Sequence, residues 1–367
     1  AKEVFSAIFT DLKYAIENIP GDAYPKADYP KNDGHITKYA AEALLARAYL
    51  FYTGYYGEEP VEVTRAEALA AVEDVIASGE YGLVPQFKNL WPASSAKVAE
   101  KGDYETLKGT YAGDGNKETI LALKFTATQD YNGNNDSNRW QVMLGMRQLN
   151  AAPYCKGWGA LTVNPDFVEA FPTGDLVGEG ITGSADFTTS FNDWREYTGY
   201  AVKKYAPLCY ADGSHAGKQD GSGDFQTQNR QDYVIIRYAD VLLMAAELGS
   251  PNAQTYFDQV RKRAYQVDDN GTVSANYQAK SVSQQAIMEE RRLEFAFESI
   301  NYWDLLRQGI DVAAEKLALN GVKVKSGGAD DAITIRVDRV KATKGLSQIP
   351  YNQINLSQSV LVQNPGW

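Results

Sequence analysis

The run of residues 37–52, TKYAAEALLARAYLFY, is the feature that most constrains the fold of this chain. It is apolar on almost every side, because only Lys38, Glu42 and Arg47 interrupt it with charge. A helix that is hydrophobic all round has to be buried between neighbouring elements. The chain must therefore supply several further helices around this one, which predicts a mainly α protein.

The first of those neighbours follows directly. Thr64 and Glu67 have the spacing of a capping box, and the helix that they start runs to a stop at Gly79, so that it forms a hairpin with residues 37–52. Residues 1–18 also read as a helix, with apolar residues near three- and four-residue spacing. Because the chain begins inside a helix, we expect no signal peptide in it and a processed or truncated start.

Two more hairpins are predicted in the second half. Residues 233–248, YVIIRYADVLLMAAEL, read as another buried helix, and residues 252–265 as its amphipathic partner. A cap at Ser281 and Gln284 is expected to start a third helix that runs through Phe297. Residues 302–307 continue it as a short helix.

Three such pairs indicate stacked antiparallel hairpins of the tetratricopeptide kind, interrupted by a long insertion. We expect a single domain over the whole chain, with the scaffold at about 1–82 and 231–310. The insertion, at about 83–230, is rich in Gly, Asn, Asp, Ser and Thr and should hold short helices at most, one of them starting at Asn164-Pro165. Residues from about 311 to 367 form a C-terminal tail. Long irregular segments usually carry binding residues.

Charge excludes some partners. The chain has 36 basic and 47 acidic residues, a formal net charge of −11, which opposes binding to nucleic acid or to an anionic lipid surface. No stretch approaches the roughly 18 to 20 apolar residues that a membrane helix needs.

The aromatic content points to a ligand. The chain holds 24 Tyr and 6 Trp, and in the insertion these stand among Asn, Gln and Gly. Flat rings can cover sugar faces while polar edges bond to hydroxyls, although most Tyr residues are expected to fill helix interfaces. The segments QDYNGNNDSNRWQ and PYCKGWGAL provide the candidate glycan-binding residues Tyr131, Asn134, Asn135, Asp136, Arg139, Trp140, Tyr154 and Trp158.

The sequence contains few patterns that indicate a catalytic site or a metal site. The charged residues 290–298 lie three or four apart and are read as ion pairs rather than as a glycosidase pair. No G-x-S-x-G elbow is present, and His35 and His215 are expected to be exposed loop residues. We expect no cofactor, although structural calcium in the loops is left open; residues 268–271, DDNG, are read as a turn. Cys155 and Cys209 fit either one disulfide or two buried thiols.

Several segments together resemble the SusD/RagB family. They are RYADVLLMAAEL, IMEERRLEFAFESINYWDLLRQG and the closing IPYNQINLSQSVLVQNPGW, with KYAAEALLARAYLFY and NPDFVEAFPTGD earlier in the chain. Trp303 and Trp367 lie in the scaffold motifs of that family and are assigned to packing, Trp303 against the preceding helix. Trp91 and Trp194 lie in irregular regions, where either could cover the scaffold.

The resemblance implies a non-catalytic surface lipoprotein of the outer membrane. Such a protein captures oligosaccharide and passes it to a SusC-like TonB-dependent transporter. It also implies a lipid anchor, as the only attachment to the membrane, and an N-terminal helical region, and we expect both to be absent from this chain. The rival hypothesis is a helical-repeat protein that binds peptide or protein cargo, and an enzyme ranks last.

Overall fold

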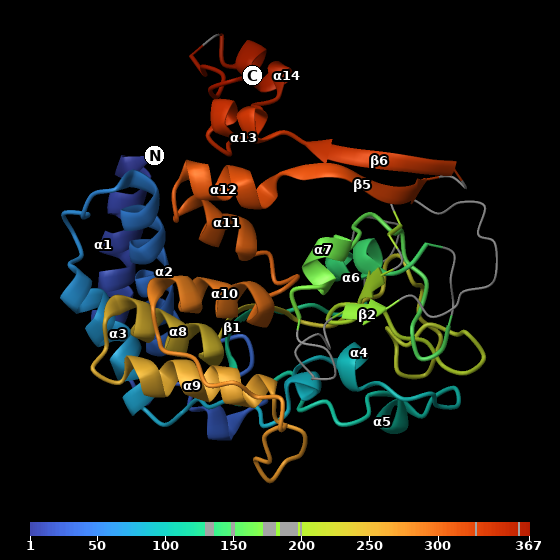
Figure 1. Cartoon of the computed structure of the whole chain (residues 1–367). Coiled ribbons are helices and arrows are strands. Elements are labelled where there is room, and N and C mark those ends of the chain that lie inside the picture. Colours follow the sequence, from blue (N-terminus) through green and yellow to red (C-terminus); the bar gives the residue numbers. More distant parts are fainter. Residues whose placement is uncertain are drawn as a thin grey trace.

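The computed structural model describes residues 1–128, 136–147, 151–171, 181–183, 197–198, 200–326, 329–358 and 360–367. Most of its regular structure is helical, and the strands form two-stranded sheets. Figure 1 shows a layered group of helices on one side and a loop-rich region on the other. The mainly α prediction is therefore confirmed.

The scaffold consists of helices from both ends of the sequence. They are α1 (Lys2–Asn18), α2 (Lys38–Tyr56), α3 (Arg65–Ala77), α8 (Tyr238–Leu248), α9 (Ala253–Ala264), α10 (Gln284–Glu294) and α11 (Asn301–Leu306). The α2/α3, α8/α9 and α10/α11 pairs contact each other in sequence order, and α3 packs on α8. Tyr49 and Leu242 are fully buried in the core between them, so the stacked-hairpin prediction holds.

Two helix starts test the capping predictions. The Thr64 hydroxyl accepts a hydrogen bond from the Glu67 backbone N–H, and the Glu67 carboxylate accepts one from the Thr64 backbone N–H, so the predicted capping box is present. The cap of α10 is Ser283, not Ser281, because the Ser283 hydroxyl accepts from the Ala286 backbone N–H. This helix ends at Glu294, short of the predicted Phe297. Phe297 could not continue it, because its φ of +63° lies outside the right-handed helical region.

The prediction of one helix over residues 233–248 is wrong at its start. Residues Tyr233–Arg237 form strand β4, which pairs antiparallel with β1 (Thr119–Leu123), and α8 begins only at Tyr238. The β-branched run at 234–236 favours a strand, and its partner lies more than a hundred residues earlier, where local periodicity carries no signal. The strand pair carries Arg237 into the interior.

The insertion is largely irregular, as predicted. Besides β1, its elements are a 3₁₀ turn at Phe87–Leu90, α4 (Pro92–Ser95), α5 (Tyr104–Leu107), α6 (Arg139–Leu144), α7 (Pro165–Val168), β2 (Ile181–Gly183) and β3 (Tyr200–Val202). The short strands were not predicted. A further 3₁₀ turn, at Lys26–Asp28, lies outside the insertion. The Asn164 side chain accepts from the Asp166 backbone N–H, so the predicted cap is present. Trp91 is buried in a small core of this region and covers the scaffold; Trp194 lies outside the described residues.

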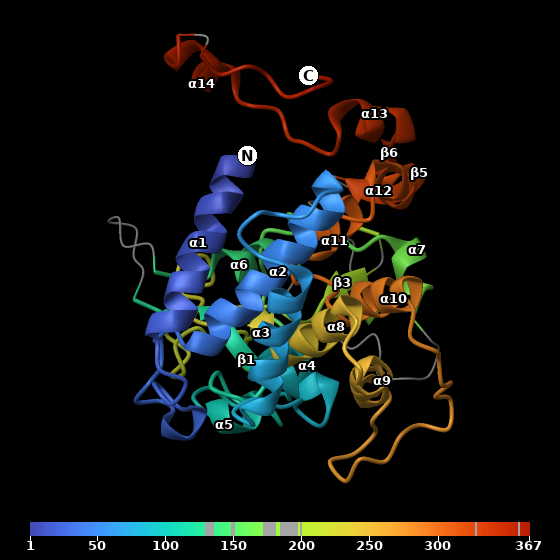
Figure 2. The ribbon, with the colours of Figure 1, turned by 90° about the vertical axis from the view of Figure 1, so that its left-hand side faces the viewer.

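The tail contains α12 (Ile310–Leu317), the hairpin β5 (Leu319–Ser326) and β6 (Ala329–Ile335), α13 (Val337–Thr343) and α14 (Tyr351–Leu356). Figure 2 shows the last of these extending clear of the scaffold, near the end where α1 begins. Trp367 lies in this segment, with Arg339 over its ring and its Nε1 donating to the Leu346 carbonyl oxygen at 2.8 Å. The segment exposes Leu356 and Val360.

A buried charge cluster, which we call the ionic core, joins β4 to α9, α10 and the loop before β1. It holds three cations and three carboxylates: Lys204, Arg237, Arg263, Glu118, Glu294 and Glu298. Burial alone would raise the pKa of Glu118, but Arg263 and Arg237 outweigh it and hold that pKa below its usual range. The ion-pair role predicted for residues 290–298 is thus confirmed for Glu294 and Glu298.

Glu42 of α2 is a buried carboxyl with an incomplete set of partners. Its Oε1 lies 3.4 Å from the Lys38 ammonium, but its Oε2 has no hydrogen-bond partner among the described residues. Burial, followed by the charge of Asp74, raises the pKa of Glu42 to about 8. The folded protein therefore keeps a proton here that the unfolded chain, with an ordinary pKa of 4.5, loses.

We expect Glu42→Gln to stabilise the protein increasingly as pH rises. The raised pKa means that the stability of the unmutated protein falls between pH 4.5 and pH 8, because the unfolded state ionises first. The neutral amide avoids this loss, so the variant should gain about 1–2 kcal/mol at pH 8 and nearly nothing at pH 4.5. Urea denaturation at both pH values measures this, and a gain independent of pH would contradict the assignment.

Candidate functional site

Trp158 and Arg139 at the start of α6, two of the predicted glycan-binding residues, lie together among the described residues. The Trp158 backbone N–H donates to the Val142 carbonyl oxygen at 2.7 Å, which fixes the loop beside the helix. The guanidinium of Arg139 lies 5.9 Å from the centre of the Trp158 ring, and the indole Nε1 donates to Gln226 Oε1 at 3.3 Å. The half-buried ring is thus held with a guanidinium over it and an amide at its indole nitrogen.

The predicted residues fall into four groups, of which the first three are as follows. Trp158 and Arg139 lie together, as described. Tyr131, Asn134 and Asn135 lie outside the described residues. Trp140, although on the same helix as Arg139, is half-buried on the inner side, with its ring edge-on to Tyr233 at 6.2 Å.

The two remaining predicted residues serve local structure. Asp136 accepts hydrogen bonds from the hydroxyls of Thr126 and Thr128, which ties the loop before α6 to the end of β1. Tyr154 stands opposite Leu208 in an isolated antiparallel bridge, and the Lys203 ammonium lies 6.0 Å from the centre of its ring. Both side chains are half-buried.

Sequence reasoning missed the contribution of residues 225–230. Besides Gln226, this segment supplies Phe225, whose ring lies under the Lys156 ammonium at 4.6 Å, and Arg230, whose guanidinium lies 4.7 Å from the Tyr104 ring. The aromatic and amide residues in the run FQTQNR could have marked this segment as a further candidate for sugar binding.

His215 corrects an expectation. It was predicted to be exposed, but it is buried, with Nε2 3.2 Å from Asn229 Oδ1. Burial lowers the pKa of His215 to about 4, so the ring is neutral at physiological pH and acts as a hydrogen-bonding core residue. His35 is exposed as predicted, with its ring stacked on Tyr24 at 4.1 Å.

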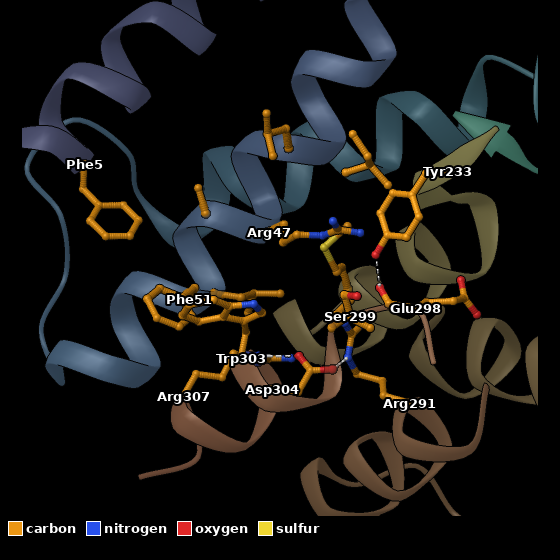
Figure 3. Close-up of a pocket in the computed structure, with 16 residues that line it drawn as sticks. Phe5, Arg47, Phe51, Tyr233, Arg291, Glu298, Ser299, Trp303, Asp304 and Arg307 are labelled. Carbon is orange, nitrogen blue, oxygen red and sulfur yellow. Dashed lines mark hydrogen bonds and ion pairs between the residues drawn. The ribbon is translucent and has the colours of Figure 1, made fainter. Parts of the chain in front are cut away.

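A cavity of about 420 Å³ opens between α1, α2, β4 and α11 (Figure 3). Its walls include Phe5, Phe51, Tyr233 and Trp303. Trp303 is 52% exposed and its ring stands edge-on to Phe51 of α2 at 5.8 Å, so its packing partner is α2 rather than the helix before it in sequence.

The polar groups of this cavity are already engaged by the protein. Arg47 donates to Asp240, and Arg291 donates to Asp304 at 2.8 Å. The Tyr233 hydroxyl donates to the Glu298 carbonyl oxygen at 3.2 Å. A sugar needs free donors and acceptors around its ring, so this cavity suits apolar side chains better than it suits a glycan.

A second hollow, of about 780 Å³, lies between the end of α2 and helices α10, α11 and α12. Its amide side chains bond within the protein: Gln284 donates to Glu247, Gln285 to Glu289 and Gln308 to the Asp304 carbonyl oxygen. The hollow contains no Trp or Tyr among its lining residues. It therefore lacks the ring surface that a sugar would stack on.

No metal centre is found where the chain is described. No group of three or more His, Cys, Asp or Glu residues there could hold an ion. Residues 268–271 form a turn, in which Asp268 Oδ1 accepts from the backbone N–H of Asn270 and of Thr272.

Among the described residues, no helix combines the length and apolar character that crossing a membrane requires.

The fold and the loop surface define a class: a helical-hairpin scaffold that presents aromatic loops on one side. The family model described as "SusD family" matches residues 177–367. The chain belongs to the SusD family.

Curated relatives and solved structures agree with this assignment. The SusD-like protein P2 of Formosa agariphila is 24% identical, over 88% of this chain and 58% of its own length. A SusD-like protein of Bacteroides ovatus is 22% identical, over 83% and 50%. This chain thus spans little more than half of these relatives.

Surface glycan-binding protein A from Bacteroides fluxus is 22% identical and superposes with a TM-score of 0.72, over 100% of this chain and 70% of that one. The protein of the same name from Bacteroides thetaiotaomicron, in complex with laminarihexaose, gives 0.70 at 20% identity, over 98% and 70%. These likenesses establish the shared fold.

Proposed function

We propose that this protein captures oligosaccharide at the cell surface without cleaving it and delivers it to a SusC-like TonB-dependent transporter of the outer membrane. The observation that carries the proposal is the Trp158 ring with the Arg139 guanidinium over it and Gln226 at its indole nitrogen. The ring offers a stacking face, and the two side chains offer donors and acceptors for hydroxyls. Family membership and the laminarihexaose complex of a relative support the same function.

The transporter partner and the location are proposed from the family. A protein of this kind would be held at the outer membrane by a lipid anchor, with its binding loops facing outward. The formal charge of −11 is consistent with a neutral ligand rather than an anionic one.

Non-catalytic capture is favoured because the carboxylates of α10 are already engaged. Glu294 is bound in the ionic core, and Glu290 accepts from Arg261 at 2.8 Å. Burial raises the pKa of Glu290 to about 7, yet this residue lines neither of the cavities described above. A glycosidase needs two carboxyl groups that face one cleft.

We expect Trp158→Ala to lower retention on a glycan affinity gel about tenfold, which corresponds to losing about 1.4 kcal/mol of ring stacking. Trp367→Ala is the matched control, because Trp367 also carries an arginine over its ring but lies in the C-terminal tail. An array of glycans read against the unmutated protein and both variants gives the comparison. Reducing sugar is assayed in the same samples.

Two results would count against the proposal. Release of reducing sugar would mean an enzyme, and equal binding by Trp158→Ala and the unmutated protein would remove the site.

A second candidate function, binding of peptide cargo, is favoured by the apolar cavity beside Phe51. Phe51→Ala should then weaken peptide binding while Trp158→Ala leaves it unchanged.

A further inference from the structure

Two segments of the insertion run side by side and each carries one cysteine. The backbone N–H of Cys155 donates to the Pro207 carbonyl oxygen at 2.7 Å, and that of Cys209 donates to the Pro153 carbonyl oxygen at 2.9 Å. Tyr154 and Leu208 face each other between these two bonds in antiparallel register. Cys155 follows Tyr154 and Cys209 follows Leu208, so the two cysteines lie diagonally across the same antiparallel bridge.

Both cysteines are buried, at 2% and 0% residue exposure, and neither is in a disulfide. Their side chains are in hydrogen-bonding contact with each other, and Cys209 Sγ also donates to the Tyr154 carbonyl oxygen at 3.1 Å. The contact with Cys209, followed by burial, raises the pKa of Cys155 well above its usual range. Among the described residues, no third His, Cys, Asp or Glu side chain joins the pair in a group that could hold a metal ion.

We propose that Cys155 and Cys209 form a redox pair that closes into one intrachain disulfide when the protein meets a small-molecule disulfide. The backbone bonds hold the two cysteines on neighbouring segments, and their side chains are already in hydrogen-bonding contact, so closure needs a small local movement. The inference is independent of glycan binding, because it rests on the sulfur atoms alone.

The chemistry balances with a disulfide of the glutathione type as oxidant. One cysteine thiolate attacks a sulfur of that disulfide, which releases one small thiol and leaves a mixed disulfide. The second cysteine then displaces the other small thiol and forms the Cys155–Cys209 bond. Two protons and two electrons leave the protein, and one oxidant molecule becomes two thiols.

The bond would have two measurable consequences. It closes the long loop of residues 156–208, which constrains the unfolded chain and should raise the melting temperature by on the order of 5 °C. Its formation should be slow, over hours at neutral pH, because both side chains are buried, and Cys209, whose pKa the contact with Cys155 lowers, should be the attacking thiol. Alkaline pH should accelerate it.

The test is to incubate the whole protein with oxidised glutathione at pH 8.5, unfold it, alkylate the remaining thiols and map the peptides. We expect a mass loss of about 2 Da, one peptide pair linked through Cys155 and Cys209, and its separation by dithiothreitol. Cys155→Ser and Cys209→Ser should each stop at a glutathione adduct.

The unmutated protein alone can overturn the proposal, so it does not depend on the folding of the variants. Recovery of both cysteines as separately alkylated or separately glutathionylated residues after long incubation would exclude the pair. Links between different chains would do the same. A lower melting temperature in the linked form would show that the bond distorts the fold and is not one that the structure accommodates.

Discussion

Replacing Arg237 with alanine is expected to lower the free energy of unfolding by about 3–5 kcal/mol, the largest effect of any single change considered for this chain. Arg237 donates to Glu118, Glu294 and Glu298 at once, and it is 3% exposed. The ionic core balances three positive against three negative groups. Without Arg237 an uncompensated negative charge stays in a site with almost no water.

Urea denaturation at pH 7 measures this change. The matched control is Arg336→Ala, which removes an exposed arginine whose partner, Asp338, is also exposed, so that it should change the free energy of unfolding far less than Arg237→Ala does. Equal effects of the two variants would mean that the buried cluster contributes no more than a surface pair.

The unmutated protein should also lose stability below about pH 4.5, where carboxylates with depressed pKa values such as Glu118 and Glu298 take up protons only on unfolding.

Replacing Gly54 with alanine is expected to destabilise the protein by about 2 kcal/mol, although glycine to alanine inside a helix ordinarily stabilises by up to about 1 kcal/mol. Gly54 lies in α2, where a β-carbon would come within 2.3 Å of the Arg307 carbonyl oxygen and 2.8 Å of its Cβ. Arg307 ends α11 and is held by Glu247 of α8. The new methyl group would therefore push α11 away from α2.

Gly82→Ala serves as the control, because a β-carbon at that position meets no atom within 4 Å. It should be neutral or stabilise by up to about 1 kcal/mol, since alanine restricts the unfolded chain. Thermal unfolding of the two variants side by side gives the comparison. If Gly54→Ala proved as stable as Gly82→Ala, the close approach of α2 and α11 would not exist in solution.

The sequence alone predicted the helical hairpins because their signals are local. Apolar residues at helical spacing and the Thr64–Glu67 capping box depend on neighbours within a few positions, and both are present in the structure. The motifs around 238–307 and the closing QNPGW also led to the right family. Their order along the chain is itself a property of the sequence.

Tertiary structure decided the parts that depend on pairing between distant segments. Glu118 meets Arg237 and Arg263 only after β1 pairs with β4, and residues 233–237 therefore became a strand despite a helical reading. His215 is buried for a related reason, because loops without periodicity carry no signal of what will cover them.

The candidate site shows the same division. Composition indicated that the insertion holds rings and amides suited to sugars, and it singled out Trp158 and Arg139. Only the fold brought Gln226 to the Trp158 indole and turned Trp140 inward, although Trp140 is next to Arg139 in sequence. Side chains one residue apart on a helix point about 100° apart, so the direction of each depends on which face of α6 the rest of the protein covers.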